Sequence, residues 1–336
     1  MRSLFMPHGH IVSSHLRRAD STPILGRMLF QAGSLLLVII SVYLLKRIHI
    51  FSDKSYKVVQ GLVFNLTLPC AIVMSFATNK HPMNLLWLVV FGLFACMIPL
   101  FIAYFGSRGD EPRYRAYQML NASGLNIGAF CLPVVQTFMG PSAGLPVIML
   151  DIGNAIIATA ASLTITRSLL HLGSPTKNLP MSLRIKNIAR DFYSSISFDC
   201  YMLMLVFMFA GWTVPQWIVT LITPFANANA FAAMAMIGLM MEIPDNHKDR
   251  SELGKVIAWR FLFSIIIALS AWFLLPLDER VREIVVLAAF APVTIFSTKF
   301  TDSLTGNAKL AGFSLTVTAI IGLTFMTILH AVLPVT

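Results

Sequence analysis

Long apolar runs separated by short polar segments dominate the chain. Spanning a hydrocarbon core of about 30 Å takes roughly 20 mainly apolar residues in a helix, and runs of that length recur along the whole sequence. The runs are continuously apolar rather than alternating, which favours helices over a β-barrel because a helix satisfies its own backbone polar groups in lipid. The pattern predicts helices near residues 28–45, 58–77, 85–105, 116–138, 144–166, 192–211, 217–241, 256–276, 284–303 and 309–333.

We therefore expect an all-α polytopic membrane protein of about ten transmembrane helices, with nine and eleven as the alternatives. The fourth, sixth and ninth helices are the weakest because polar residues interrupt them. The longest polar connection, residues 167–191, follows the fifth helix and divides the chain into two sets of five. Homologous units with an odd number of helices must lie in opposite orientations, which is the inverted-repeat plan of secondary transporters.

This plan divides the chain into four parts. Residues 27–170 and 192–336 form the two five-helix repeats, and a basic cytoplasmic linker over residues 171–191 joins them. Residues 1–26 form an N-terminal extension that lacks the apolar run of a signal peptide. A translation start at Met6 or Met28 is the alternative interpretation of that extension.

Composition and charge agree with a membrane location. Of 336 residues, 57% are hydrophobic and 12% are charged, whereas soluble domains carry about 25% charged residues. The chain has 25 Lys and Arg against 15 Asp and Glu, and most of the cations lie in the loops on one side of the predicted helices. Because cytoplasmic loops carry an excess of Lys and Arg, we expect a multi-pass protein of the cell (inner) membrane with both termini outside. The same placement argues against a nucleic-acid partner.

Motifs for cofactors and catalysis are missing from the sequence. The four cysteines lie singly in apolar stretches, with neither disulfide nor zinc spacing. No nucleotide-binding signature and no His-Glu-x-x-His motif occurs. We expect no cofactor, no metal, no direct ATP drive and no enzymatic activity.

The segment from Asn121 to Pro133 is hard to explain as a lipid-facing helix. Gly124 and Gly128 weaken the helix, Pro133 removes a backbone donor, and Asn126 is costly against lipid. A broken helix whose amides face a cavity accounts for these residues. Close packing through small residues, with Asn forming bonds between helices, is the alternative.

Prolines recur at similar intervals in the two halves, Pro69 before Pro133 and Pro224 before Pro292. Helix-breaking residues at matching positions point to a substrate site in transporters of this plan. The alternative is that prolines are simply frequent in transmembrane helices.

Four ionisable residues fall in or near predicted spans, where each costs about 2.5–3.5 kcal/mol at a helix centre. Asp199 lies near a helix start and is expected at the interface. Asp302 follows Lys299 by one helical turn, so the two form an ion pair or a functional site. Asp151, with Asn154 one turn later, either presents oxygens to a cation or a proton or caps a helix that begins later than predicted.

Several short motifs resemble the auxin efflux carrier family, which includes bacterial malate and malonate permeases. The stretch Val63–Pro69 resembles the family's second-helix pattern, and Ala291–Pro292 resembles its ninth-helix proline. Further matches along the chain are Asn126, Gly128, Pro133, Gly140, Asn154 and Gly238. The resemblance covers residues 28–333, and its strength lies in the order and spacing of the motifs.

The resemblance implies two inverted five-helix repeats whose fourth and ninth helices are broken and cross near the midplane, where a small organic anion binds through its carboxylate. The ninth helix departs from the family because no Asn follows Pro292 in this stretch, whereas Lys299 does. The substrate-binding candidates are Asn126, Gly128, Pro133, Pro292, Thr294, Lys299 and Asn65. The candidates for ion coupling or support are Asp151, Asn154 and Asp302.

The sequence thus predicts a permease or efflux carrier that moves a small organic anion by alternating access. An ion-coupled symporter of a related inverted-repeat fold and a non-transporting membrane sensor on the same fold are the alternatives. The expected partners are the substrate and the lipid bilayer, while coupling to protons or sodium and assembly as a homodimer stay open.

Overall fold

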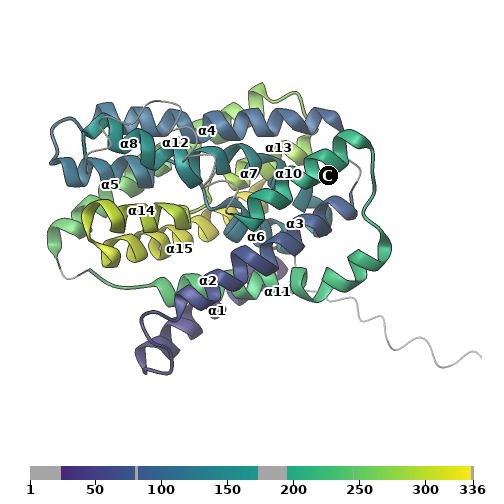
Figure 1. The fold of residues 1–336 in the computed structure, drawn as a ribbon, viewed down its shortest axis with the longest axis horizontal. Helices are drawn as coiled ribbons and strands as arrows, with labels where there is room; N and C mark the ends of the chain where they lie inside the picture. Colours follow the sequence, from purple (N-terminus) through teal and green to yellow (C-terminus); the bar gives the residue numbers. More distant parts are fainter. Residues whose placement is uncertain (1–23, 80–81, 173–194, 245, 334–336) are drawn as a thin grey trace, which may run out of the picture.

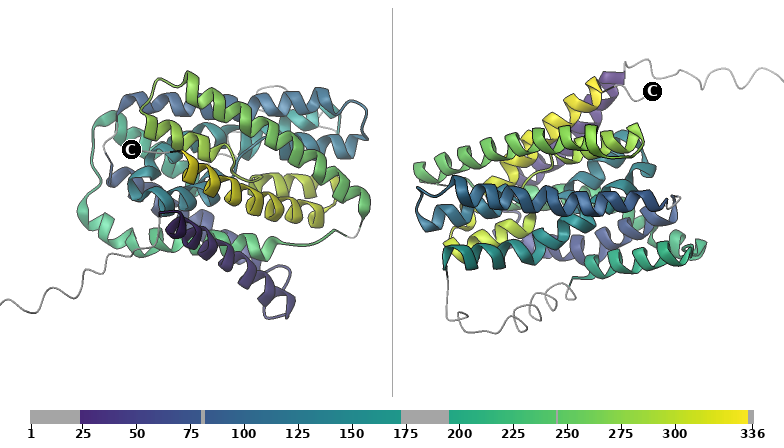
Figure 2. Two further views of the ribbon diagram at one scale, coloured as in Figure 1. Left: turned by 180° about the vertical axis from the view of Figure 1, so that it is seen from behind. Right: turned by 90° about the horizontal axis from the view of Figure 1, so that it is seen from above.

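The computed structural model describes residues 24–79, 82–172, 195–244 and 246–333, and within these ranges the chain is helical with no β-strand. Most helices run along the long axis of the molecule, and α1 lies obliquely at its lower edge in Figure 1. The views from behind and from above show the same arrangement (Figure 2). The predicted all-helical class is confirmed for the described residues.

Helices before residue 173 follow the predicted order. They are α1 (Ile24–Arg47), α2 (Tyr56–Leu62), α3 (Leu68–Ala77), α4 (Leu86–Gly106), α5 (Pro112–Ala122), α6 (Leu132–Met139), α7 (Gly144–Ile156) and α8 (Ser162–Leu170). Single π-helical turns at Val63–Thr67 and Ile157–Ala161 join α2 to α3 and α7 to α8, and a third at Ile127–Cys131 leads into α6.

Helices after residue 194 complete the fold. They are α10 (Ile196–Ala210), α11 (Gln216–Met240), α12 (His247–Leu274), α13 (Glu279–Ala288), α14 (Ile295–Thr305) and α15 (Ala308–Val332). The predicted extension at 1–26 and the linker at 171–191 lie almost wholly outside the described residues.

Seven helical segments of the described chain are long and apolar enough to cross a membrane. The three predicted spans outside this set are the fourth, sixth and ninth, which are the spans that the sequence marks as weak. In the structure α10 is short, and the fourth and ninth spans are each divided into two helices, α5 with α6 and α13 with α14.

Close contact joins helices both within one half of the chain and between the two halves. α4 packs against α7, and α1 packs against α11. A Cβ on Gly153 of α7 would collide with the Val89 carbonyl oxygen of α4. In lipid, where no hydrophobic effect drives helix association, such small residues allow the close packing that holds helices together.

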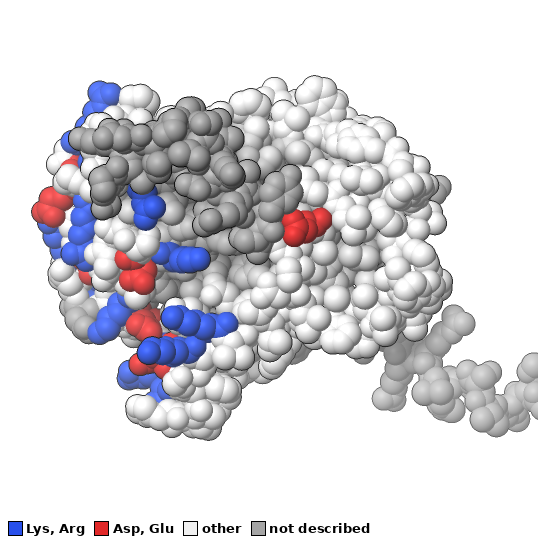
Figure 3. Space-filling view, viewed as in Figure 1, with Lys and Arg blue, Asp and Glu red and all other residues white. Residues whose placement is uncertain are grey.

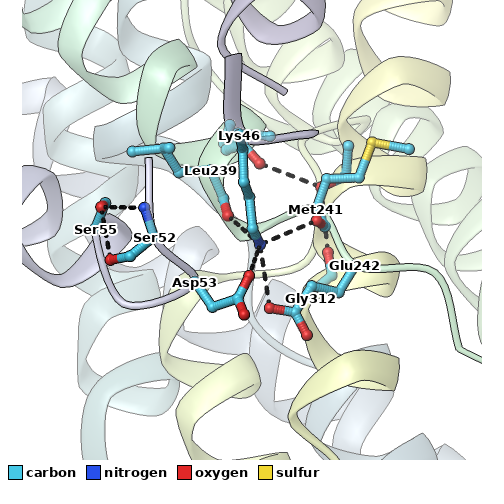
Figure 4. A network of polar contacts seen from close by, with 10 residues as sticks. Lys46, Ser52, Asp53, Ser55, Leu239, Met241, Glu242 and Gly312 are labelled. Atoms are coloured by element: carbon cyan, nitrogen blue, oxygen red, sulfur yellow. Dashed lines mark hydrogen bonds and ion pairs between the residues drawn. The ribbon is translucent and has the colours of Figure 1, made fainter. Parts of the chain in front are cut away.

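Charged side chains gather at one end of the molecule, and most of the remaining face in Figure 3 is uncharged. Lys46, at the end of α1, is buried (Figure 4). Its Nζ donates to the carbonyl oxygen of Leu239 at 3.0 Å and to Glu242 Oε1 at 3.1 Å. This network fastens the end of α1 to the end of α11.

Candidate functional site

The fourth predicted helix breaks between α5 and the π-helical turn at Ile127. Gly124 adopts φ +68°, a left-handed conformation that glycine reaches without a Cβ penalty. Pro133 instead lies inside the continuous helical segment Ile127–Met139, where its π-helical turn passes into α6. The expectation that this helix unwinds at Pro133 is therefore wrong, and the break occurs at Gly124.

The ninth predicted helix breaks between Ala288 and Ile295, and this stretch contains Pro292. The two interruptions lie side by side: Leu125 and Val293 form an antiparallel bridge, and the Asn126 N–H donates to the Pro292 carbonyl oxygen at 2.9 Å. Because the two breaks pair their backbones, part of the polar backbone that unwinding exposes is satisfied inside the protein.

A cavity of about 40 Å³ adjoins this junction. Its lining includes five residues that the sequence singled out, namely Asn126, Gly128, Asp151, Asn154 and Thr294. These come from the fourth, fifth and ninth predicted helices, and Tyr201 of α10 adds a phenol. The lining contains no lysine or arginine. A cavity of this size holds only a few water-sized groups, so an organic solute requires the surrounding helices to separate.

Asp151 is buried within α7 and is held by three donors. It accepts hydrogen bonds from Tyr201 Oη at 2.5 Å, from Asn154 Nδ2 at 2.7 Å and from the Gly128 backbone N–H. Since α7 begins at Gly144, the interpretation of Asp151 as a helix cap is wrong. Its carboxylate lies at the N-terminal end of the half-helix that starts at Ile127, where the helix dipole favours a negative charge.

Asn154 binds the backbone of the first interruption, at Leu125. Its Oδ1 accepts from the Leu125 N–H at 2.9 Å, and its Nδ2 donates to the Leu125 carbonyl oxygen at 2.8 Å. The Cys96 thiol also donates to Oδ1. One amide side chain thus satisfies both backbone groups of Leu125, on the opposite side from the bridge to Val293.

Asn126 differs from Asn154 because its amide has no partner. The residue is 4% exposed, yet its Nδ2 makes no hydrogen bond. Nearby, α14 begins after Thr294 without a side-chain cap. A buried donor and an uncapped helix N-terminus thus face the same cavity, and both favour an anion.

The other predicted site residues do not line this cavity. Asn65 is exposed on the π-helical turn between α2 and α3, and Pro133 is buried in α6. Pro292 contributes its carbonyl oxygen to the junction. Lys299 and Asp302 line a different cavity, of about 340 Å³, and form no ion pair with each other. Asp199 is exposed in the first turn of α10, which agrees with an interfacial position.

The aromatic rings of Phe64 and Phe296 pack together, with centroids 5.5 Å apart. Both residues line the smaller cavity, whereas Gln60 and Thr298, one turn or less away on the same two segments, line the larger one. The two segments that carry this pair therefore contribute to both cavities.

The buried charges that the sequence analysis did not single out include one inside a predicted span and one at the edge of another. Arg260 lies inside the predicted span 256–276, and Glu283 lies just before the span 284–303, where it contacts His330 Nδ1 at 2.8 Å. A charged residue in an apolar run was the available signal. Tyr201 carried no signal, because tyrosine is common in membrane helices.

Divided helices that meet around buried polar groups are a feature of membrane transporters built from discontinuous helices. Residues 32–187 match a family model described as membrane transport protein, the auxin efflux carrier-like family. The resemblance to that family is confirmed over this segment, which holds the first interruption. No curated protein sequence matches the chain.

Proposed function

We propose that the chain is a secondary transporter that carries a small organic anion, such as a carboxylate, by alternating access. The observation that carries the proposal is the unpartnered Nδ2 of Asn126, buried beside the uncapped N-terminus of α14. Leaving a buried donor unpaired costs about 1–3 kcal/mol. A carboxylate at this position accepts that hydrogen bond and interacts favourably with the α14 dipole.

The arrangement of helices supports the inverted-repeat plan. Counted with each divided helix as one span, the described segments make five spans before residue 173 and five after residue 194. The divided helix is the fourth of each set. In this class of transporter, substrate sites lie near the bilayer midplane where discontinuous helices meet, so we infer that the junction is the substrate site.

The orientation follows from the charged end in Figure 3. Lys248 pairs there with Glu111, and Lys255 pairs with Asp110. Since cationic loops remain on the cytoplasmic side, this end faces the cytoplasm and both chain termini lie outside. A cysteine reporter at Thr176 tests the orientation, because labelling from the outside contradicts it.

Flux through the purified protein in proteoliposomes tests the function. A panel of labelled mono- and dicarboxylates identifies a transported anion, and Asn126→Ala then weakens its binding. A charge-assisted hydrogen bond is worth about 1.5–3 kcal/mol, or roughly ten- to a hundredfold in affinity. Asn84→Ala is the matched control, since Asn84 is exposed in a short turn before α4. Unchanged binding in Asn126→Ala contradicts the proposed site.

A carrier that couples the anion to a cation is the second candidate, favoured by Asp151. Its carboxylate shares the cavity with the proposed substrate position, and no basic side chain lines that cavity. Two anions in one low-dielectric site repel each other strongly, so a proton on Asp151 or a bound cation makes joint occupancy favourable. Asp151→Asn removes that requirement. If the chain is such a symporter, the variant loses the dependence of uptake on an imposed ion gradient. If it is a sensor, it binds the anion without flux.

A further inference from the structure

Arg260 is a buried cation that the proposed anion site does not use. It lies on α12, is 7% exposed, and reaches the junction from the side opposite the cavity that contains Asn126. Its Nη1 donates to the carbonyl oxygens of Asn121 and Gly124, each at 3.1 Å, and its Nη2 donates to that of Ala291 at 2.5 Å.

These three carbonyls belong to the ends of two half-helices. Asn121 lies in the last turn of α5, Gly124 follows that helix, and Ala291 follows α13. The last carbonyls of a helix lack helical partners and carry the negative end of its dipole. Two such ends therefore meet at one guanidinium, which satisfies three acceptors in the fork geometry that distinguishes arginine from lysine.

The three carbonyl oxygens stabilise the Arg260 guanidinium without help from a carboxylate. None of the described Asp or Glu side chains forms an ion pair with Arg260. Lys46 provides the contrast, because it also binds helix-end carbonyls but has Glu242 at 3.1 Å and Asp53 at 3.7 Å (Figure 4). A buried charge without a counter-ion is costly, so the converging half-helix ends must compensate that of Arg260.

In transporters built from discontinuous helices, such C-terminal ends and unwound carbonyls coordinate Na⁺ or H⁺. We propose that Arg260 is the resident cation of this position: its guanidinium occupies the place of a coupling metal ion and ties both interruptions to α12 as one moving unit. Arg260 is a positioning residue, since it touches the junction and not the substrate. For transport this rests on the proposed function, and it implies that the carrier needs no sodium at this position.

Chemical rescue tests the proposal without any substrate. Arg260→Ala leaves a guanidinium-shaped space among three carbonyl oxygens, so millimolar guanidinium chloride should raise its melting temperature in detergent relative to choline chloride. Arg282→Ala is the matched control, because Arg282 donates to the single carbonyl of Trp272 from a partly exposed position. Guanidinium should stabilise neither this control nor the unmodified protein. Equal responses of the two variants overturn the proposal.

Two further measurements remain decisive if Arg260→Ala does not fold. Arg260→Lys keeps the charge but loses the fork, and should melt above the isosteric apolar variant Arg260→Met. For the unmodified protein, replacing sodium by choline should leave the melting temperature unchanged. Once a transported anion is known, the same replacement should change the rate of anion uptake by no more than about twofold. Uptake that requires sodium overturns the inference while leaving the anion carrier intact. Rescue by guanidinium without any anion flux supports the inference and refutes the proposed function.

Discussion

The two interruptions have the same construction but different surroundings. At the first, Asn154 pairs with both backbone groups of Leu125, and Asp151 occupies the N-terminal end of the half-helix that follows. At the second, the Val293 N–H donates to Thr318 Oγ1 at 3.2 Å, and α14 begins without a side-chain cap. The first half-helix thus has the Asp151 carboxylate at its N-terminal end, whereas the N-terminus of α14 has no side-chain cap and is available to an anion. In the site that we propose, the first junction is the fixed side and the second is the side that accepts a ligand.

Among the variants that test the difference between the two interruptions, Asn154→Leu should have the largest effect. It leaves the Leu125 N–H and carbonyl oxygen and one oxygen of Asp151 without their partner, and each buried unsatisfied group costs about 1–3 kcal/mol. We expect a loss of about 3 kcal/mol or more in stability, seen as a strongly lowered melting temperature in detergent. Thr318→Val is the counterpart at the second junction and should cost about 1 kcal/mol. Equal losses contradict the difference between the two sides.

Gly128→Ala should have the second-largest effect, because it displaces the Asp151 carboxylate directly. An added Cβ would lie 2.5 Å from Asp151 Oδ2 and 2.9 Å from Tyr201 Oη, so the carboxylate must move away from the half-helix. Crowding of this kind costs about 1–3 kcal/mol. Thermal unfolding measures the loss, and Gly140→Ala, where an added Cβ meets open space but φ is +86°, gives the cost of glycine conformation alone. A smaller loss in Gly128→Ala than in Gly140→Ala would refute this account.

Gly124→Ala should have a smaller effect and links the two interruptions. Its φ of +68° costs an L-residue roughly 1–2 kcal/mol, and the new Cβ would approach Thr294 Cγ2 to 2.9 Å. Trimming that neighbour in the double variant Gly124→Ala with Thr294→Ser should recover the steric part of the loss. Strict additivity of the two changes in thermal unfolding would show that the interruptions do not touch here.

Asp110→Asn should have the smallest effect. Asp110 lies just before the N-terminus of α5 and pairs with Lys255 of α12. The hydrogen bond from Lys255 holds the pKa of Asp110 below its ordinary value of 3.8. A lowered pKa in the folded state stabilises the protein above the ordinary pKa and loses that contribution as the pH falls through the folded-state value. The contribution is under about 1 kcal/mol because the pair is partly exposed. Melting temperatures of the unmodified protein and Asp110→Asn should differ at neutral pH and converge in acid; a constant difference argues against the pair.

Periodicity and length predicted the fold well because membrane helices must be long and apolar, and polar interruptions in the fourth and ninth spans correctly marked both divided helices. The sequence pattern could not locate the break in the fourth span, since Pro133 is the stronger helix-breaking signal. The break occurs instead at Gly124, which has a positive φ. Lys299 lies only one turn beyond Phe296, but α14 leads away from the junction and carries it into another cavity. The direction of a half-helix is a tertiary property that spacing along the chain does not contain.

The same limit applies to the residues that the structure places away from the junction and to those that the sequence analysis missed. Asn65 belongs to a family-like motif, yet the register of its helix exposes it. Arg260 lies outside the motifs and becomes relevant only when three carbonyl oxygens from two distant stretches of the chain converge on it. Asp151 and Asn154 were found because a carboxylate and an amide one turn apart in an apolar run are costly unless they have partners.

The aromatic pair of Phe64 and Phe296 has a consequence for membrane energetics. An elementary charge that leaks across a membrane dissipates about 2.3 kcal/mol for every 100 mV of potential, so a carrier at rest must be an electrical insulator. Two uncharged rings 5.5 Å apart place apolar surface beside the cavity of about 40 Å³, and apolar constrictions are a known way to block hydrated ions. For the proposed carrier, an apolar barrier at this pair would keep ion leakage low between transport cycles.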